Sequence, residues 1–221
     1  PRRYWGTYAF RGGEAEPLIV EIPRPVGEFG TMEMGVRLAD ELSARALFLP
    51  GAHWASNHGG ATDWTADGNT DTVFHLAHQV MLRDYDWDET PLVAQLRGFR
   101  PRDRTWQTST TDGSIYVPAT RNDIVLSLGV ETPAPSVTTD EAVELEAALS
   151  ALGYTVGYFD GNAQHIAFAA RDNAQLGYMT SHGAGVFAHV WVSSDVRERY
   201  RHATMPDSFV DLAVQLDLAA S

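Results

Sequence analysis

The chain has 221 residues, of which 44% are hydrophobic and 10% aromatic, enough to bury the core of one globular domain. Its formal net charge of −13 excludes nucleic acid and anionic lipid as main partners, because both require basic patches. No apolar run approaches the ~20 residues of a membrane helix, and no signal-peptide pattern is present, so we expect neither and leave the compartment open. Cysteine is absent, which excludes disulfides and leaves only His, Asp or Glu to hold a zinc ion.

Apolar runs and helical periodicities alternate along the chain. Strands are predicted at residues 18–22, 46–49, 92–96, 124–128, 154–159 and 186–192, and helices at residues 31–43, 70–83, 138–152 and 207–218. Thr31 is predicted to cap the first helix, and Thr139 or Asp140 the third, which Gly153 ends. Strands that alternate with such helices indicate a mostly parallel, twisted sheet with helices on both faces. Without repeats or a linker, we predict one α/β domain over residues 1–221.

In an open sheet of this kind, chemistry gathers in the loops after the carboxyl ends of the strands. The loops richest in polar groups are residues 23–30, 51–69 and 97–113. The chain has no G-x-S-x-G, P-loop or H-E-x-x-H motif, and no G-x-G-x-x-G after a strand. The common signatures of serine hydrolases, zinc proteases and nucleotide-binding proteins are therefore missing.

Four histidines are candidate ligands. His53 and His58 lie in the predicted loop, beside Trp54, where they could contact a ligand or only satisfy the backbone of the loop. His75 and His78 are three residues apart on a predicted helix and could face one metal ion. The simpler interpretation of this common spacing is a helix surface, or a semi-buried pair with its own hydrogen bonds.

Several short segments at predicted strand ends occur in an order that resembles one enzyme group. They are Trp5-Gly6-Thr7-Tyr8, Val20-Glu21-Ile22-Pro23-Arg24-Pro25, Gly51-Ala52-His53, Gln95-Leu96-Arg97-Gly98-Phe99, and Phe187-Ala188-His189-Val190-Trp191 followed by Arg197. Over most of the chain, the pattern resembles domains related to N-formylglutamate amidohydrolases and poly-γ-glutamate hydrolases. The resemblance implies a carboxypeptidase-like α/β fold and zinc-dependent cleavage of amide bonds next to carboxylates.

The chain departs from this family's pattern where the resemblance implies a zinc site. Arg24 stands in place of the first histidine ligand and Arg97 in place of the third ligand, whereas Glu28 matches the acidic second ligand. Trp191 stands in place of the glutamate that serves as base and acid. Arginine has no lone pair for a metal and stays protonated, and tryptophan cannot accept a proton from water. We therefore expect no cofactor and no amide hydrolysis at these positions.

Three functions remain open. The leading hypothesis is a catalytically altered, inactive homologue that binds a small acidic ligand or serves a structural or partner-binding role, the partner being a protein or another domain of a longer chain. Its ligand-binding candidates are Arg24, Glu28, His53, Arg97 and Trp191, although an internal Arg–Glu salt bridge could simply fill the same place. The alternative is an active amide hydrolase of the deformylase or γ-glutamyl hydrolase type with a relocated zinc site, drawn from His53, His58, Asp63, His75 and His78, or with Glu28 as a further ligand. A third possibility is a metal-free hydrolase that uses Asp and His as acid and base.

Overall fold

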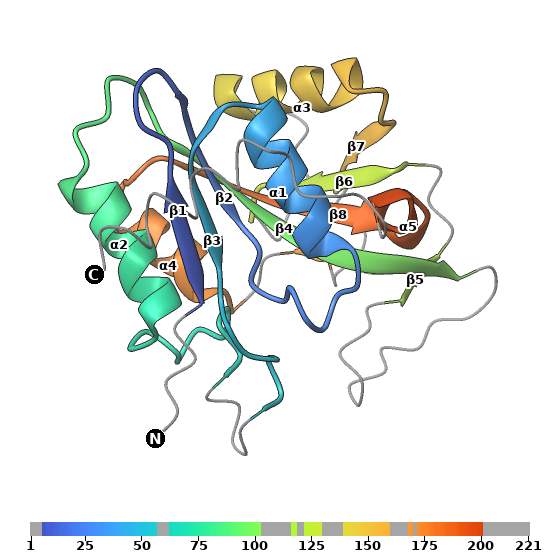
Figure 1. Ribbon diagram of the computed structural model, residues 1–221, viewed down its shortest axis with the longest axis horizontal. Helices are drawn as coiled ribbons and strands as arrows, with labels where there is room; N and C mark the ends of the chain where they lie inside the picture. Colours follow the sequence, from blue (N-terminus) through green and yellow to red (C-terminus); the bar gives the residue numbers. More distant parts are fainter. Residues whose placement is uncertain are drawn as a thin grey trace.

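An extended sheet forms the centre of the computed structural model, which describes residues 6–56, 62–102, 116–118, 122–129, 139–159, 168–169 and 172–200 (Figure 1). Within these residues the sheet has eight strands in the order β1-β3-β2-β4-β8-β6-β7, and β5 pairs with β4. The strands are β1 (Thr7–Phe10), β2 (Glu16–Glu21), β3 (Ala44–Leu49), β4 (Leu92–Arg102), β5 (Tyr116–Pro118), β6 (Ile124–Ser127), β7 (Val156–Tyr158) and β8 (Val186–Ser193). Only β1–β3 and β6–β8 pair antiparallel among the described strands, so the predicted mostly parallel α/β sheet is confirmed.

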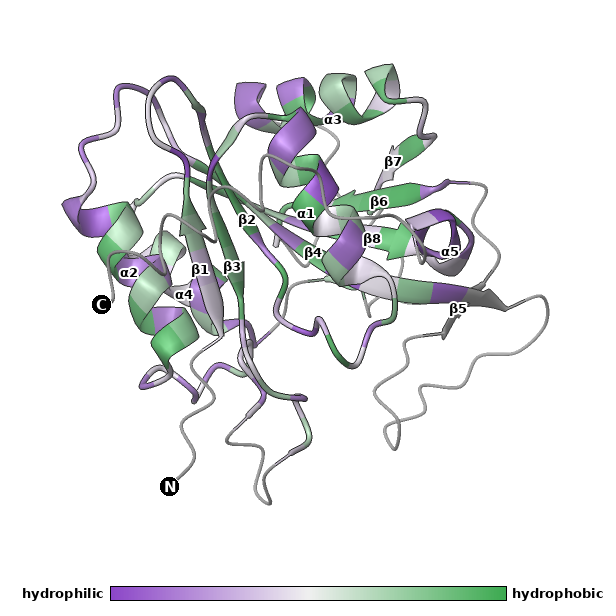
Figure 2. Cartoon of the chain, viewed as in Figure 1, coloured by the Kyte–Doolittle hydropathy of each residue, from purple (hydrophilic) through white to green (hydrophobic). Residues whose placement is uncertain are grey.

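Helices cover both faces of the sheet, as predicted. They are α1 (Thr31–Glu41), α2 (Val73–Asp84), α3 (Asp140–Ala151), α4 (Ala174–His182) and α5 (Ser194–Tyr200). Residues of α1, α3 and α5 share one apolar core with alternate residues of the strands, and residues of α2 and α4 share another with the opposite alternation. Figure 2 shows hydrophobic residues along β3 and β6, and both kinds of residue on α1 and α2. In the described part, no helix has both the length and the hydropathy that a membrane crossing needs.

The structure corrects two predictions near the carboxyl edge. Strand β4 continues to Arg102, so Arg97 lies inside the strand and not in a loop after it. Thr31 is the first residue of α1 and not its cap; the N-cap is Gly30, with φ of 79°, and Thr31 Oγ1 donates to the carbonyl of Glu28 at 2.6 Å. A left-handed φ favours glycine, which explains why Gly30 and not Thr31 occupies the N-cap position.

Other elements differ in extent or were not predicted. Helix α2 begins at Val73, after a cap by Thr72, and Thr139 caps α3, one of its two predicted caps. Gly153, with φ of 89°, follows the end of α3 as expected. The prediction omitted β1, β5, α4 and α5. The helix predicted at residues 207–218 lies outside the described residues.

Helix α1 approaches the sheet closely because residue 35 has no side chain. A Cβ at Gly35 would lie 2.3 Å from Cδ1 of Ile22 and 3.2 Å from Cδ2 of Leu96. We expect Gly35→Ala to lower the free energy of unfolding by about 1–3 kcal/mol, the usual cost of overpacking a core.

The matched control is Gly177→Ala in α4, where the nearest atom to an added Cβ is 3.6 Å away. This variant should gain about 0.5–1 kcal/mol, because alanine loses less backbone entropy in a helix than glycine does. Urea denaturation of both variants measures the difference. Equal effects at the two positions would contradict the close packing of α1.

Candidate functional site

Polar residues from three parallel strands meet on one face of the sheet near its carboxyl edge. In the register of the sheet, Glu21 of β2 lies beside Gln95 of β4, which lies beside His189 of β8. Two residues further on, Arg97 lies beside Trp191. Because side chains two apart on a strand point the same way, all five belong to the face that α2 and α4 cover.

Glu28 joins two arginines at this edge. Its Oε1 accepts a hydrogen bond from Nε of Arg97 at 2.9 Å, and its Oε2 accepts one from the backbone N–H of Gly98 at 2.5 Å. Nη1 of Arg24 lies 3.8 Å from the same Oε1, and Nη2 of Arg24 donates to Asp63 at 3.2 Å. Glu28 is 7% exposed and Arg97 5%. The structure therefore brings together Arg24, Glu28 and Arg97, and Asp63 meets part of their positive charge.

A third arginine adds to the positive charge. Arg197 of α5 is buried and donates to the carbonyls of Val192, Phe99 and Phe29. Burial and the neighbouring Arg97 lower the pKa of Arg24 to about 10, so Arg24 remains protonated at neutral pH. Arg24 and Arg97 thus pair with two carboxylates, Glu28 and Asp63, whereas Arg197 is held by backbone carbonyls.

A pocket of about 310 Å³ opens beside the cluster. The guanidinium of Arg97 lies 4.8 Å from the ring centroid of Trp191, a cation–π contact that orients it. Trp191 is itself held by a hydrogen bond from Nε1 to the carbonyl of Phe168 at 2.9 Å. Residues from four parts of the chain line the pocket: Arg24, Asp63, Thr65, Ala66, Asp67, Arg97, Ala169, Asp172, Asn173, His189 and Trp191.

His189 connects the pocket to a buried hydrogen-bond network centred on Gln95. Nε2 of Gln95 donates to Glu21 at 3.0 Å, so Oε1 of Gln95 points the other way and accepts from Asn173 at 2.8 Å. The same Oε1 lies 2.7 Å from Nε2 of His189, which must therefore carry the proton. Nδ1 of His189 is then a bare lone pair, buried and without a hydrogen-bond partner among the described residues.

The electrostatic surroundings keep His189 neutral. Burial lowers the pKa of His189 well below its usual 6.5, and the positive charges of Arg97 and Arg24 lower it further. A neutral imidazole is consistent with the single proton that the hydrogen bond to Gln95 requires. The pocket wall thus combines two guanidinium groups, an indole and an uncharged imidazole with the carboxylates of Asp63, Asp67 and Asp172.

The remaining metal candidates do not come together. His75 and His78 are buried on α2 with hydrogen-bond partners of their own, so the interpretation as a helix surface is wrong and the one as a hydrogen-bonded pair holds, with deeper burial than expected. His78 Nδ1 lies 2.8 Å from Glu21, and His75 Nδ1 lies 3.2 Å from Gln175. His53 is half-buried, and its Nδ1 accepts from the N–H of Ala55. His58 lies outside the described residues. Within the described ranges, no group of three or more His, Asp or Glu could hold a metal ion.

The loop that carries His53 supports Arg24. The ring of Trp54 lies 4.8 Å from the guanidinium of Arg24. A Cβ on Gly27 would lie 2.9 Å from Trp54 and 3.2 Å from His53 Nε2, so this loop packs directly on the segment between Arg24 and Glu28. His53 therefore lies next to the cluster, without a hydrogen bond to Arg24, Glu28 or Arg97.

The donor set at Arg24, Glu28, Arg97 and Trp191 does not fit a zinc ion. Both oxygens of Glu28, the one available ligand among the four, already accept N–H donors. The adjacent guanidinium groups would repel a divalent cation, and a catalytic zinc takes about three protein ligands.

Sequence reasoning missed most of the buried network, including Glu21, Gln95, Asn173, Gln175 and His189. A signal was present, because Glu21 and Gln95 each interrupt an apolar run in a predicted strand. A polar side chain in a strand that is buried on both faces needs a hydrogen-bond partner. When two such strands lie side by side, their polar side chains can bond to each other.

No protein-family model and no curated protein matches this chain. Among solved structures, it is similar to YndL in its zinc-free apo form, with 14% identity and a TM-score of 0.49, over 100% of this chain and 92% of that one. It is also similar to N-formylglutamate amidohydrolase from Ralstonia eutropha JMP134, with 14% identity and a TM-score of 0.40, over 86% of each chain. These similarities concern the chain trace, and the chemistry of the pocket follows from the residues of this chain.

Removal of Glu28 should destabilise the protein strongly. Glu28→Ala leaves two buried guanidinium groups with one partner fewer, a loss of about 3–5 kcal/mol for a broken buried ion pair. Glu14→Ala, at an exposed turn, is the control and should change stability by less than about 0.5 kcal/mol. Chemical denaturation measures both, and similar midpoints for the two variants would show that Glu28 is not buried between charges.

Stability should fall as the pH drops below about 6.5. The unfolded chain takes up a proton at His189 near pH 6.5, whereas the folded chain does so only at much lower pH, and His75 shifts in the same direction because of burial and the nearby His78. Each pH unit below this point therefore costs roughly 1 kcal/mol through His189, and His75 adds to the loss in the same direction. His189→Gln, which keeps an N–H donor toward Gln95, should remove its share of the slope. Denaturation midpoints between pH 7 and 5 test this, and an unchanged slope in the variant would contradict the neutral His189.

Proposed function

We propose that this chain binds a small carboxylate-bearing molecule in the pocket beside Arg97 and does not hydrolyse amides there. The observation that carries the proposal is the buried guanidinium of Arg97, which lines the pocket and keeps N–H donors beyond those bound to Glu28. A carboxylate in the pocket would accept these donors. Asp63, Asp67 and Asp172 also line the pocket, so the attraction for an anion is local to Arg97.

Arg97 is the residue that we expect to meet the ligand. Glu28 lies 2.9 Å from both its Nε and its Nη2, which fixes one edge of the guanidinium. The face lies against Trp191. A guanidinium has five N–H donors, so donors remain after Glu28 is satisfied. A group held in this way loses little side-chain entropy on binding, and a carboxylate suits its fork geometry.

Arg24 and the indole of Trp191 complete the binding site. Arg24 lines the pocket but is bound to Asp63, so we expect it to attract the anion at longer range. The buried indole excludes water from one wall, and a drier wall strengthens charge contacts. At about 310 Å³, the pocket is at the small end of ligand sites, which suits a compact acid.

Four groups around the pocket offer little for catalysis. Glu28 and Asp63 both have their oxygens engaged by guanidinium, hydroxyl or backbone N–H groups. Trp191 offers only an N–H, and the carbonyl of Phe168 accepts it. His189 has a bare Nδ1, but this atom is buried, and burial lowers the pKa of the ring well below its usual 6.5, which makes it a weak base. Activation of water for attack on an amide needs a stronger base or a metal-bound hydroxide. These four groups therefore favour binding without turnover.

Thermal shift and calorimetry with glutarate, glutamate and sulfate test the proposal. A carboxylate at millimolar concentration should raise the melting temperature, and Arg97→Met should weaken binding by about tenfold or more. Arg97→Lys, which keeps the charge but not the fork, should bind with intermediate affinity. The control is Arg37→Met, an exposed arginine paired with Glu41 on α1.

Two results would overturn this function. One is the absence of any shift with all three anions in the unaltered protein, which would leave the cluster a purely structural ion pair. The other is a carboxylate shift that Arg97→Met and Arg37→Met reduce equally, which would place the anion elsewhere on the molecule.

A further inference from the structure

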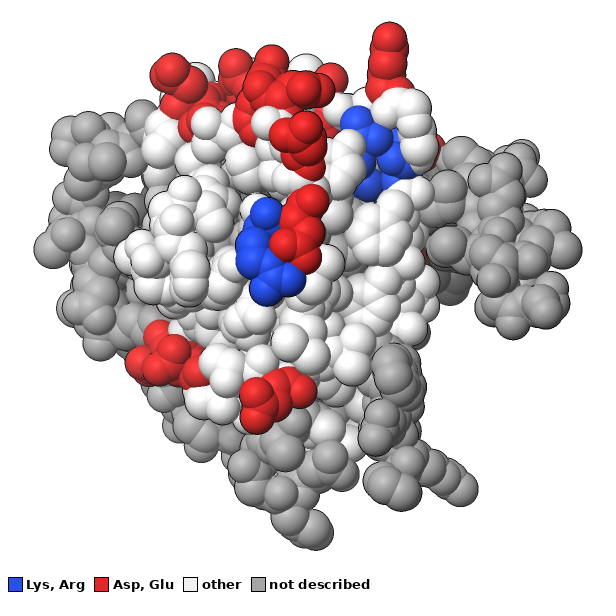
Figure 3. All heavy atoms as spheres, turned by 90° about the vertical axis from the view of Figure 1, so that its left-hand side faces the viewer, with Lys and Arg blue, Asp and Glu red and all other residues white. Residues whose placement is uncertain are grey.

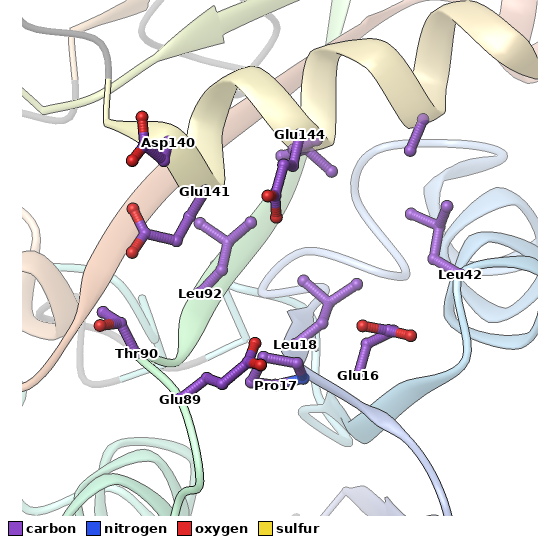
Figure 4. Close-up of a pocket in the computed structure, with 12 residues that line it drawn as sticks. Glu16, Pro17, Leu18, Leu42, Glu89, Thr90, Leu92, Asp140, Glu141 and Glu144 are labelled. Carbon is purple, nitrogen blue, oxygen red and sulfur yellow. The ribbon is translucent and has the colours of Figure 1, made fainter.

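A second hollow lies at the opposite edge of the sheet, where β2 and β4 begin. It has a volume of about 520 Å³ and lies beneath α3 (Figure 4). Its apolar floor is formed by side chains from both strands, from the end of α1 and from α3: Leu18, Leu42, Leu92, Leu145 and Ala148. Among the residues that line it, Thr90 is the only one with an uncharged polar side chain.

Five carboxylates surround this apolar floor. Glu16 comes from the start of β2, Glu89 from the segment before β4, and Asp140, Glu141 and Glu144 from the first two turns of α3. Figure 4 shows Glu144 and Glu89 entering the hollow from opposite walls. At the level of α3, carboxylates crowd the upper edge of the face in Figure 3. None of the five forms an ion pair with a described residue.

Local structure accounts for only part of this arrangement. Asp140 and Glu141 lie in the first turn of α3, where a negative charge is favourable with the helix dipole. Glu16, Glu89 and Glu144 have no such role. Like charges around an apolar surface repel one another more strongly than they would in open water. The rim is therefore charged on several sides, and none of the residues that line the hollow is a cation. Arg45 lines an adjoining hollow with Glu16 and Glu89, but it donates to the backbone carbonyls of residues 11, 13 and 15.

We propose that this hollow binds a linear aliphatic polyamine, a molecule with two or more ammonium groups separated by methylene chains. The ammonium groups would reach carboxylates on opposite walls, and the methylenes would lie on the leucine floor. Burial of each methylene contributes about 0.8 kcal/mol. A cation with a single charge would meet one wall and leave the other unpaired.

Other occupants match the hollow less well. A peptide would bring backbone N–H and C=O groups that need partners, and the floor of leucine and alanine side chains provides few. A metal ion needs several carboxylates converging on one point, whereas these are spread around a floor, and the described residues contain no group able to hold one. The combination of an apolar floor and a charged rim is complementary to an alkyl chain with charged ends.

Calorimetry of the full chain with spermidine tests the proposal, with butylamine as the single-charge probe. We expect saturable binding of one spermidine, and much weaker binding of butylamine at equal ionic strength. The triple variant Glu16→Gln, Glu89→Gln, Glu144→Gln should bind spermidine at least about tenfold more weakly than the unaltered protein. Its melting temperature without ligand should be unchanged or higher, because repulsion between like charges is relieved.

The control is a triple variant of the same net charge, Glu14→Gln, Asp71→Asn, Asp86→Asn, at exposed positions outside the hollow. It should bind spermidine as the unaltered protein does. Equal loss in both triple variants, or equal binding of spermidine and butylamine, would reduce the effect to general attraction to an acidic protein and overturn the proposal. Binding of a basic peptide without binding of spermidine would also overturn it, in favour of a peptide partner. None of these outcomes depends on the carboxylate pocket, which shares no residue with this hollow.

Discussion

The contact on which the carboxyl edge depends is the one between Glu28 and the β4 segment at Arg97 and Gly98. It ties the loop before α1 to the centre of the sheet through one side-chain and one backbone donor. Gly98 also leaves room for Arg197, because a Cβ there would lie 2.7 Å from the Arg197 guanidinium carbon. Arg197 in turn donates to carbonyls of β4, β8 and the same loop. One carboxylate and one missing side chain thus allow buried guanidinium groups on both faces of β4, Arg97 on one and Arg197 on the other.

The buried network on the same face follows from a single acid. Oε2 of Glu21 accepts a hydrogen bond from Nε2 of Gln95, so the amide of Gln95 turns its N–H groups toward Glu21. That orientation presents the carbonyl oxygen of Gln95 to His189, which fixes the proton on Nε2 and leaves Nδ1 bare. The protonation state of a pocket residue on β8 is therefore set by a carboxylate on β2, two strands away. The two positively charged arginines beside it act in the same direction, since they disfavour a second proton.

Local patterns predicted the sheet and the helices at residues 31–43, 70–83 and 138–152 because their periodicities are strong. The proximity of Arg24, Glu28 and Arg97 was also within reach, since parallel strands bring their carboxyl ends together. The end of β4 was predicted too early because glycine and proline, here Gly98 and Pro101, commonly end strands. The burial of His75 and His78 could not be predicted, since two histidines three residues apart have the same spacing on a helix surface and in a core. Only a partner 57 residues away, Glu21, distinguishes the two.

The two hollows are electrically and sterically separate even though one strand reaches both. Leu92 of β4 lines the acidic hollow, and Arg97 of the same strand lines the pocket at the carboxyl edge. They are five residues apart, roughly 17 Å along the strand, and an odd spacing places them on opposite faces of the sheet. At physiological ionic strength a charge is screened over about 8 Å, so the carboxylates of one site cancel little of the positive charge at the other. A chain with a net charge of −13 can therefore keep a local site for an anion, provided that its positive charge is made by buried groups next to the pocket and not by the surface as a whole.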